Sequence, residues 1–201
     1  MVENQLRRRG IRQQSLLNAM ETVPRHLFIA ESARPEAYVD EALPPGAASG
    51  DGLLQPYMTA LMIELLSLDG SQRVLEIGTG TGYDAAVLSR LASEVYTVEI
   101  SSRRGEEARV RLAEMGFENV HVRIGDGKEG WPSQAPFDAI ILTTAPEEVP
   151  HQLLEQLHPD GTMVVAVGSL FQELTVITKS PEGEVRKRRV EPVRMEPMSV
   201  D

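Results

Sequence analysis

The feature that most constrains the fold is the segment at residues 74–83. A mostly apolar run, residues 74–77, is followed by three glycines spaced two apart and then by an amphipathic stretch at residues 84–91. A short apolar run before a glycine turn is typical of a buried strand, and apolar residues at helical intervals are typical of a helix. The segment therefore predicts a strand, a tight turn and a helix, the first unit of a parallel α/β sheet.

The glycine turn also predicts a binding site. Glycines allow a backbone to approach a ligand closely, and a helix N-terminus offers unpaired N–H groups. A second predicted strand ends at Glu99, about 20 residues past the turn, where an acid accepts ribose hydroxyls. The Gly-x-Gly-x-Gly spacing suits S-adenosylmethionine better than a dinucleotide, and the alternative is a turn without a ligand. We expect the site for S-adenosylmethionine, called the donor site, to contain Glu76, Gly78, Thr79, Gly80, Gly82, Tyr83, Asp84, Glu99 and Ile100.

Two further strand ends carry groups that suit this site. The third strand ends in Gly125, Asp126 and Gly127, where Asp126 is placed to accept the exocyclic amine of adenine or to form a structural turn. The fourth ends at Thr143, which we expect to face the reactive centre. Ligands of open parallel sheets bind at the carboxyl ends of the strands, so we add Asp126, Gly127 and Thr143 to the site.

Strands and helices alternate from Arg73 onward, as in a doubly wound sheet. We expect strands at 74–77, 95–99, 120–124, 138–143 and 162–167, with helices at 84–92, 101–115 and 149–157. This order predicts a parallel sheet with helices on both faces. Residues 174–178 and 185–190 flank a Ser-Pro-Glu-Gly turn, which predicts a terminal antiparallel hairpin. Before the sheet we expect a helix at 3–22 broken at Gly10, a loop at 42–55 and a helix at 57–68 opened by Pro56.

Composition excludes several classes of protein. The 201 residues suffice for one α/β domain, and the absence of cysteine excludes disulfides, thiolate metal sites and a cysteine nucleophile. The four histidines show no metal spacing, so we expect no metal. A net charge of −10 argues against nucleic acid as a partner. No apolar run approaches the roughly 18 residues of a membrane span, and no signal peptide is evident. We expect a monomer in the cytoplasm that does not bind membranes.

The chain resembles one methyltransferase family over nearly its whole length. The matching motifs are residues 1–6, 23–28, 55–58, 74–83, 125–127 with 130–132, 137–141, 145–146 and 191–198. These resemble the protein-L-isoaspartate (D-aspartate) O-methyltransferases. The resemblance implies a Rossmann-like methyltransferase fold in a single domain, residues 1–201. Residues 1–55 would form the helical cover and acceptor loop, and residues 56–201 the donor-binding core with its terminal hairpin.

The resemblance also implies a reaction. Such enzymes methylate the free carboxylate of an isoaspartyl residue with S-adenosylmethionine, and the ester collapses to a succinimide that starts repair. The partners would be damaged proteins or peptides. A carboxylate acceptor is already ionised at neutral pH and needs no general base, so the lack of a histidine pattern fits this chemistry.

The chain departs from the family in the acceptor loop. Asp51 stands where the family has a glutamine, Gly52 where it has a threonine and Leu54 where it has a serine. Because these losses remove donors to the acceptor carboxylate, Asp51 and Leu54 are acceptor positions of uncertain role. Three functions stay open: the repair enzyme, a methyltransferase with another acceptor, and a non-catalytic donor-binding protein. Asp84 would either bind the ammonium of the donor or cap the following helix.

Overall fold

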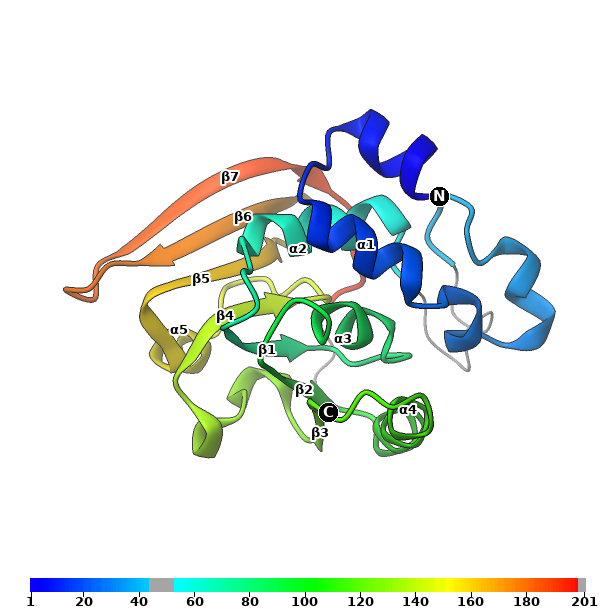
Figure 1. The fold of residues 1–201 in the computed structure, drawn as a ribbon. Helices are drawn as coiled ribbons and strands as arrows, with labels where there is room; N and C mark the ends of the chain where they lie inside the picture. Colours follow the sequence, from blue (N-terminus) through cyan, green and yellow to red (C-terminus); the bar gives the residue numbers. More distant parts are fainter. Residues whose placement is uncertain (44–52, 199–201) are drawn as a thin grey trace.

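The computed structural model describes residues 1–43 and 53–198, and Figure 1 shows its arrangement. Seven strands form one sheet in the order β3-β2-β1-β4-β5-β6-β7. The strands are β1 (Arg73–Ile77), β2 (Glu94–Glu99), β3 (Val120–Ile124), β4 (Phe137–Leu142), β5 (Leu157–Val167), β6 (Gln172–Lys179) and β7 (Val185–Val193). The strands from β1 to β5 pair in parallel, and β6 is antiparallel to both of its neighbours. The Rossmann-like sheet with an antiparallel edge is therefore confirmed.

Helices cover both faces of the sheet, as Figure 1 shows. The α-helices are α1 (Gln14–Thr22), α2 (Pro56–Leu66), α3 (Tyr83–Leu88), α4 (Ser102–Glu114) and α5 (His151–Gln156). Alternate residues of the strands point to opposite faces, so Val74 packs in the core with α1 to α4, and Leu75 packs in the core with α5. The central strands β1 and β4 are therefore buried on both sides, whereas β3 at the edge of the sheet is partly exposed.

The N-terminal helix differs from the prediction. Instead of one helix with a single break, the structure has a π-helical turn at Val2–Leu6, a 3₁₀ turn at Arg7–Arg9 and then α1. Gly10 is left-handed, with φ of 105°. The carboxylate of Glu64 on α2 then accepts the backbone N–H groups of Arg12 and Gln13 at 2.6 and 2.8 Å. These tertiary bonds hold the stretch before α1 in a non-helical conformation.

Other boundaries shift by a few residues. α3 ends at Leu88 rather than 92, and β5 begins at Leu157 rather than 162. Ser89 follows α3 and donates its hydroxyl to the carbonyl of Ala86 at 2.7 Å, a local bond that competes with helix continuation. Pro56 does open α2, because proline fits the first turn of a helix.

The topology gathers the predicted site at one edge of the sheet. The parallel strands β1, β2 and β4 all end there, followed by Gly78, Ile100 and Thr143. The C-terminal tail after β7 returns to the same edge, where Ala145 donates to the carbonyl of Glu196 and accepts from the N–H of Met198, each at 2.8 Å. A segment from the far end of the chain thus forms one wall of the site.

Candidate functional site

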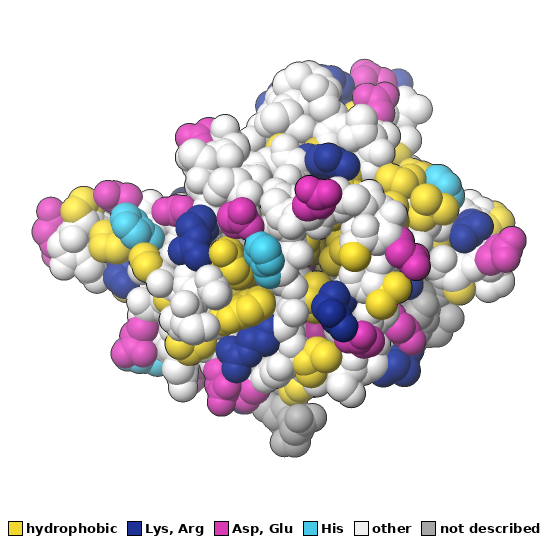
Figure 2. All heavy atoms as spheres, turned by 60° about the horizontal axis from the view of Figure 1, so that its bottom comes forward, with side chains coloured by type: hydrophobic (Ala, Val, Ile, Leu, Met, Phe, Trp, Pro, Cys, Tyr) yellow, Lys and Arg dark blue, Asp and Glu magenta, His cyan; other side chains and the backbone are white. Residues whose placement is uncertain are grey.

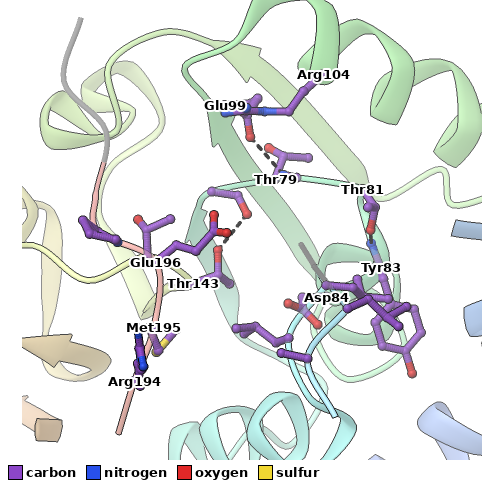
Figure 3. Close-up of a pocket in the computed structure, with 18 residues that line it drawn as sticks. Thr79, Thr81, Tyr83, Asp84, Glu99, Arg104, Thr143, Arg194, Met195 and Glu196 are labelled. Carbon is purple, nitrogen blue, oxygen red and sulfur yellow. Dashed lines mark hydrogen bonds and ion pairs between the residues drawn. The ribbon is translucent and has the colours of Figure 1, made fainter. Parts of the chain in front are cut away.

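A cavity of about 190 Å³ lies at this edge of the sheet. Figure 3 shows its labelled side chains on three sides: Glu99 and Arg104, then Tyr83 and Asp84, then Thr143 with the tail. The lining residues are Ala42, Leu43, Leu53, Leu54, Gly78, Thr79, Gly80, Thr81, Tyr83, Asp84, Glu99, Arg104, Thr143, Thr144, Arg194, Met195, Glu196 and Pro197. The structure thus brings together most of the predicted donor residues with a second set from residues 42–43, residues 53–54 and the tail.

The glycine turn forms the floor of the cavity. Gly78, Gly80 and Gly82 all have positive φ, at 100°, 51° and 86°, a region that other residues rarely adopt. Gly78 donates to Val98 of β2 at 2.9 Å, and a Cβ at this glycine would collide with Thr143. The hydroxyl of Thr143 donates to the carbonyl of Gly78 at 2.8 Å. Thr143 therefore holds the glycine turn in place and also lines the cavity.

Glu99 holds a fixed carboxylate on the cavity wall and is only 3% exposed. Its Oε2 accepts the N–H of Gly80 at 2.9 Å, and its Oε1 accepts the N–H of Ser101 at 3.0 Å. Arg104 on α4 donates Nε and Nη2 to the same Oε1 at 2.9 and 2.7 Å. Backbone and arginine together therefore orient the carboxylate and compensate its charge. The sequence prediction included Glu99 but missed Arg104. This residue lies in the first turn of α4, which places its side chain beside the end of β2.

Glu76 is fully buried and lies outside the cavity lining. The sequence analysis included Glu76 in the donor site; in the structure its carboxylate accepts the hydroxyl of Thr97 at 2.6 Å. Thr97 is also 2.6 Å from the hydroxyl of Thr79, so the link to the loop runs through two threonines. Burial, then the nearby charge of Asp84, raises the pKa of Glu76 well above its ordinary value.

Asp84 lines the cavity opposite Glu99 (Figure 3). The alternative role as a helix cap is wrong: the N-cap of α3 is Gly82 without a side-chain cap, and Asp84 accepts the hydroxyl of Thr59 on α2 at 2.9 Å. Burial raises the pKa of Asp84, whereas the Thr59 bond and the charge of Arg25 act in the opposite direction. The site therefore presents a second carboxyl group, on the wall opposite Glu99.

Arg25 connects the N-terminal cover to the predicted acceptor segment, which the structure describes at Leu53 and Leu54. It is fully buried, and its Nε donates to the carbonyl of Ala37 at 2.7 Å while Nη2 donates to the carbonyl of Leu54 at 2.5 Å. Its guanidinium lies 4.8 Å from the ring centroid of Tyr83 at the start of α3. Burial lowers the pKa of Arg25, and the nearby Tyr83 and Asp84 oppose this. One side chain thus joins the cover, the acceptor segment and the donor loop.

The acceptor segment contributes an apolar wall. Leu43 and Leu53 exchange backbone hydrogen bonds of 3.0 and 3.1 Å and are both buried. Leu54 follows, half-buried, with its side chain on the cavity lining and in contact with the core. Asp51 lies outside the described residues, so its predicted acceptor role stays a prediction.

A second, smaller cavity continues past Glu99 toward the third strand. It is lined by Ile77, Gly78, Val98, Glu99, Ile100, Arg104, Gly127, Thr144 and Met198. A Cβ on Gly127 would lie 2.5 Å from Ile77 Cγ2, so only glycine fits beside this space. Asp126 is absent from both linings and accepts the N–H of Lys128 at 2.8 Å, capping a short 3₁₀ turn. The turn role of Asp126 is the one that this structure displays.

Sequence reasoning missed several residues that line the cavity. Arg104, Thr81 and the tail residues Arg194 to Pro197 all line the main cavity. The tail had a detectable signal, because it carries a motif of the resembling family, but its position at the site depends on the bridge to Ala145. Among the described residues no cluster could hold a metal ion, and no helix is long and apolar enough to cross a membrane.

This fold and cavity define the class of protein. A parallel sheet with a glycine turn after β1, an acid after β2 and a cavity at the carboxyl edge forms the Rossmann-like fold of S-adenosylmethionine-dependent methyltransferases. Solved structures agree: a protein-L-isoaspartate O-methyltransferase matches with a TM-score of 0.86 at 30% identity, over 96% of this chain and 63% of that one. A putative Plasmodium falciparum enzyme of this type, in complex with S-adenosyl-L-homocysteine, matches with a TM-score of 0.83 at 21% identity, over 98% and 96% of the two chains.

Sequence comparison identifies the family. The model of the protein-L-isoaspartate(D-aspartate) O-methyltransferases matches residues 1–200. A protein-L-isoaspartate O-methyltransferase of Gloeobacter violaceus is 44% identical over 99% of this chain and 97% of its own. One of Opitutus terrae is 46% identical over 99% and 85%. The chain belongs to the protein-L-isoaspartate (D-aspartate) O-methyltransferase family, and the resemblance stated from the motifs is confirmed.

Proposed function

We propose that this chain transfers the methyl group of S-adenosylmethionine to the free carboxylate of isoaspartyl residues in damaged proteins or peptides. The observation that carries the proposal is one cavity with two walls: the glycine turn and Glu99 on one side, and Leu54 with the tail on the other. Family membership gives the reaction class. The ester would then collapse to a succinimide and start repair of the backbone.

The donor fits the first wall. Glu99 would accept ribose hydroxyls beside its Arg104 partner, and the adenine ring would lie toward the smaller cavity at Gly127, where a Cβ would collide with Ile77. Asp84 would attract the ammonium of the methionine moiety. When bound, S-adenosylmethionine supplies a methyl group activated by a positive sulfonium. Glu76 would act behind the loop, holding Thr79 through Thr97.

The acceptor would enter from the second wall. An ionised carboxylate attacks the methyl carbon as the carbon–sulfur bond breaks, so the chain needs no proton acceptor. Its task is to align the two groups and exclude water. Leu43, Leu53 and Leu54 would exclude water, and the guanidinium of Arg194 on the tail would offset the acceptor charge.

Methyl transfer to a matched pair of peptides tests this function. We expect labelled methyl groups from S-adenosylmethionine on an isoaspartyl peptide and not on the same peptide with an ordinary aspartate. Donor binding measured by calorimetry separates the alternatives. Failure to bind would support a non-enzymatic protein, and binding without transfer would support another acceptor.

The second candidate, a different acceptor, is favoured by one observation. Leu54 lies on the cavity wall where the family has a serine hydroxyl, and the nearby lining also includes the carboxylate of Glu196. An apolar or neutral nucleophile would suit this wall better than a carboxylate does. Competition between an isoaspartyl peptide and small neutral nucleophiles for labelled methyl groups would rank the two candidates.

We further propose a cytoplasmic monomer that binds neither nucleic acid nor membranes. The net charge of −10 would repel polyanions and anionic lipids. On the face in Figure 2, basic, acidic and apolar side chains are interspersed, so positive charge does not gather over a large area there. Sedimentation would test whether the protein is a monomer, and a binding titration would test whether it binds nucleic acid.

A further inference from the structure

Two side chains at the turn between β5 and β6 are unusually exposed. Leu170 and Phe171 are each 91% exposed, whereas the other large exposed apolar side chains of the described chain range from 38% to 47%. Isolated, partly exposed apolar residues are common on proteins. The two adjacent side chains that project almost completely into water, Leu170 and Phe171, form an apolar tip.

The apolar tip lies at the edge of the sheet that carries the site. β5 is parallel to β4 and β6 runs back from it, so the connecting turn lies at the carboxyl ends of the parallel strands. Gly168, at the start of the turn, donates to the carbonyl of Pro146 at 3.0 Å. Pro146 follows Thr143 and Thr144, which line the cavity.

A second connection joins the other end of the turn to the cavity. Gln172, directly after the apolar tip, donates Nε2 to the carbonyl of Met195 at 3.1 Å and accepts the N–H of Met195 at 2.6 Å. Both residues are buried, and Met195 lines the cavity. The turn is therefore hydrogen-bonded at both ends to segments that line the cavity, the one at residues 143–146 and the C-terminal tail.

The backbone of the turn is tightly folded. Gly168 has φ of 127°, and a Cβ at this position would collide with the carbonyl oxygen of Phe171. The backbone thus folds closely over the glycine, while the two side chains of the apolar tip lie in water. A backbone fixed in this way loses little conformational entropy when the turn binds a partner.

We propose that the apolar tip contacts apolar side chains of the substrate polypeptide next to the residue being methylated, and so gives the enzyme a preference for damaged sites with apolar neighbours. The proposal rests on the proposed function, because the peptide must enter by the acceptor wall. The continuity between the tip and that wall identifies the occupant as the substrate chain. Covering a leucine on such a surface removes apolar area from water, which favours binding.

A leucine scan tests the proposal. Isoaspartyl peptides in a serine–glycine background would carry one leucine at each nearby position, and their dissociation constants would be measured by fluorescence anisotropy with S-adenosylhomocysteine present. For the wild type we expect leucine at one or more positions to lower the Kd about tenfold. The double variant Leu170→Ser/Phe171→Ser should lose this dependence. The control Val185→Ser, which removes an exposed apolar side chain where β7 begins, should keep it.

The outcomes separate the proposal from the proposed function. Equal leucine dependence in the wild type and the double variant, or none in the wild type, would overturn the role of the apolar tip. A wild-type dimer that the double variant converts to a monomer would also overturn it, because a second copy would then cover the tip. Methylation of the leucine-free peptide is measured in parallel; if no variant methylates it, the proposed function fails while the binding scan still decides the tip. Donor affinity equal to that of the wild type shows that the double variant is folded.

Discussion

At the scale of single residues, Glu99 is the side chain on which donor binding depends most. Four hydrogen bonds, from Gly80, Ser101 and Arg104, fix its carboxylate before any ligand arrives. Such preorganisation lowers the cost of binding. Replacement by alanine would remove the acceptor and leave the Arg104 charge without this partner.

We therefore expect Glu99→Ala to weaken binding of S-adenosylmethionine by about 1.5–3 kcal/mol, the range for hydrogen bonds to a charged group. Calorimetric titration of S-adenosylhomocysteine would measure the change. Glu114→Gln on the exposed side of α4 is a suitable control. Donor affinity that stays the same in Glu99→Ala would remove the ribose assignment.

Glu76 supports a prediction about pH. Burial and Asp84 raise its pKa in the folded protein, so folding favours the protonated acid. Its contribution to stability is present below the ordinary glutamate pKa and is lost as the pH rises through the raised value. Glu76→Gln keeps an oxygen that accepts from Thr97 but cannot ionise. We expect the variant to gain stability relative to the wild type as the pH rises.

Urea unfolding at several pH values would measure this gain. The difference in the free energy of unfolding should be small at acidic pH and should grow toward alkaline pH. A difference that is the same at every pH would show that folding does not shift the pKa of Glu76, and the argument from burial would then be wrong.

At the scale of elements, Arg25 connects the N-terminal cover to the segment beside the cavity. Its two hydrogen bonds reach Ala37 in the cover and Leu54 beside the cavity. Lysine would retain the charge but lacks the planar group that reaches both carbonyls. We expect Arg25→Lys to lower the free energy of unfolding by about 2 kcal/mol and to raise the KM for peptide more than the Kd for the donor.

Arg34→Lys, an exposed change in the neighbouring 3₁₀ turn at Glu31–Glu36, provides the control. Unfolding curves and peptide kinetics on both variants would separate the roles. A loss in Arg25→Lys no larger than in Arg34→Lys would contradict the connecting role, since the two substitutions change the same chemistry in different surroundings.

The elements also show what a sequence can predict. The central strands follow from apolar runs and glycine punctuation, and the donor residues follow from their positions at strand ends. The break before α1 depends on Glu64, far along the chain, and the tail reaches the site only through Ala145. Local patterns carry no information on such contacts. The role of Arg25 could not be predicted for the same reason. Arg104 lies only five residues beyond Glu99, and the sequence reasoning missed this local contact.

At the scale of the whole molecule, the sheet brings three distant parts of the chain to one edge. The proposed donor wall comes from the segments after β1 and β2, the proposed acceptor wall from residues 42–43, residues 53–54 and the tail, and the apolar tip from the turn after β5 (Figure 1). The central claim is that this one cavity transfers the methyl group of S-adenosylmethionine to an isoaspartyl carboxylate.

The most direct test is a single-turnover reaction with the enzyme in excess over an isoaspartyl peptide, analysed by fragment mass spectrometry. We predict one added methyl group, located on the isoaspartyl residue, with the wild type and much less with Glu99→Ala at the same low donor concentration. Peptide that stays unmodified, or a methyl group found on any other residue, would contradict the account.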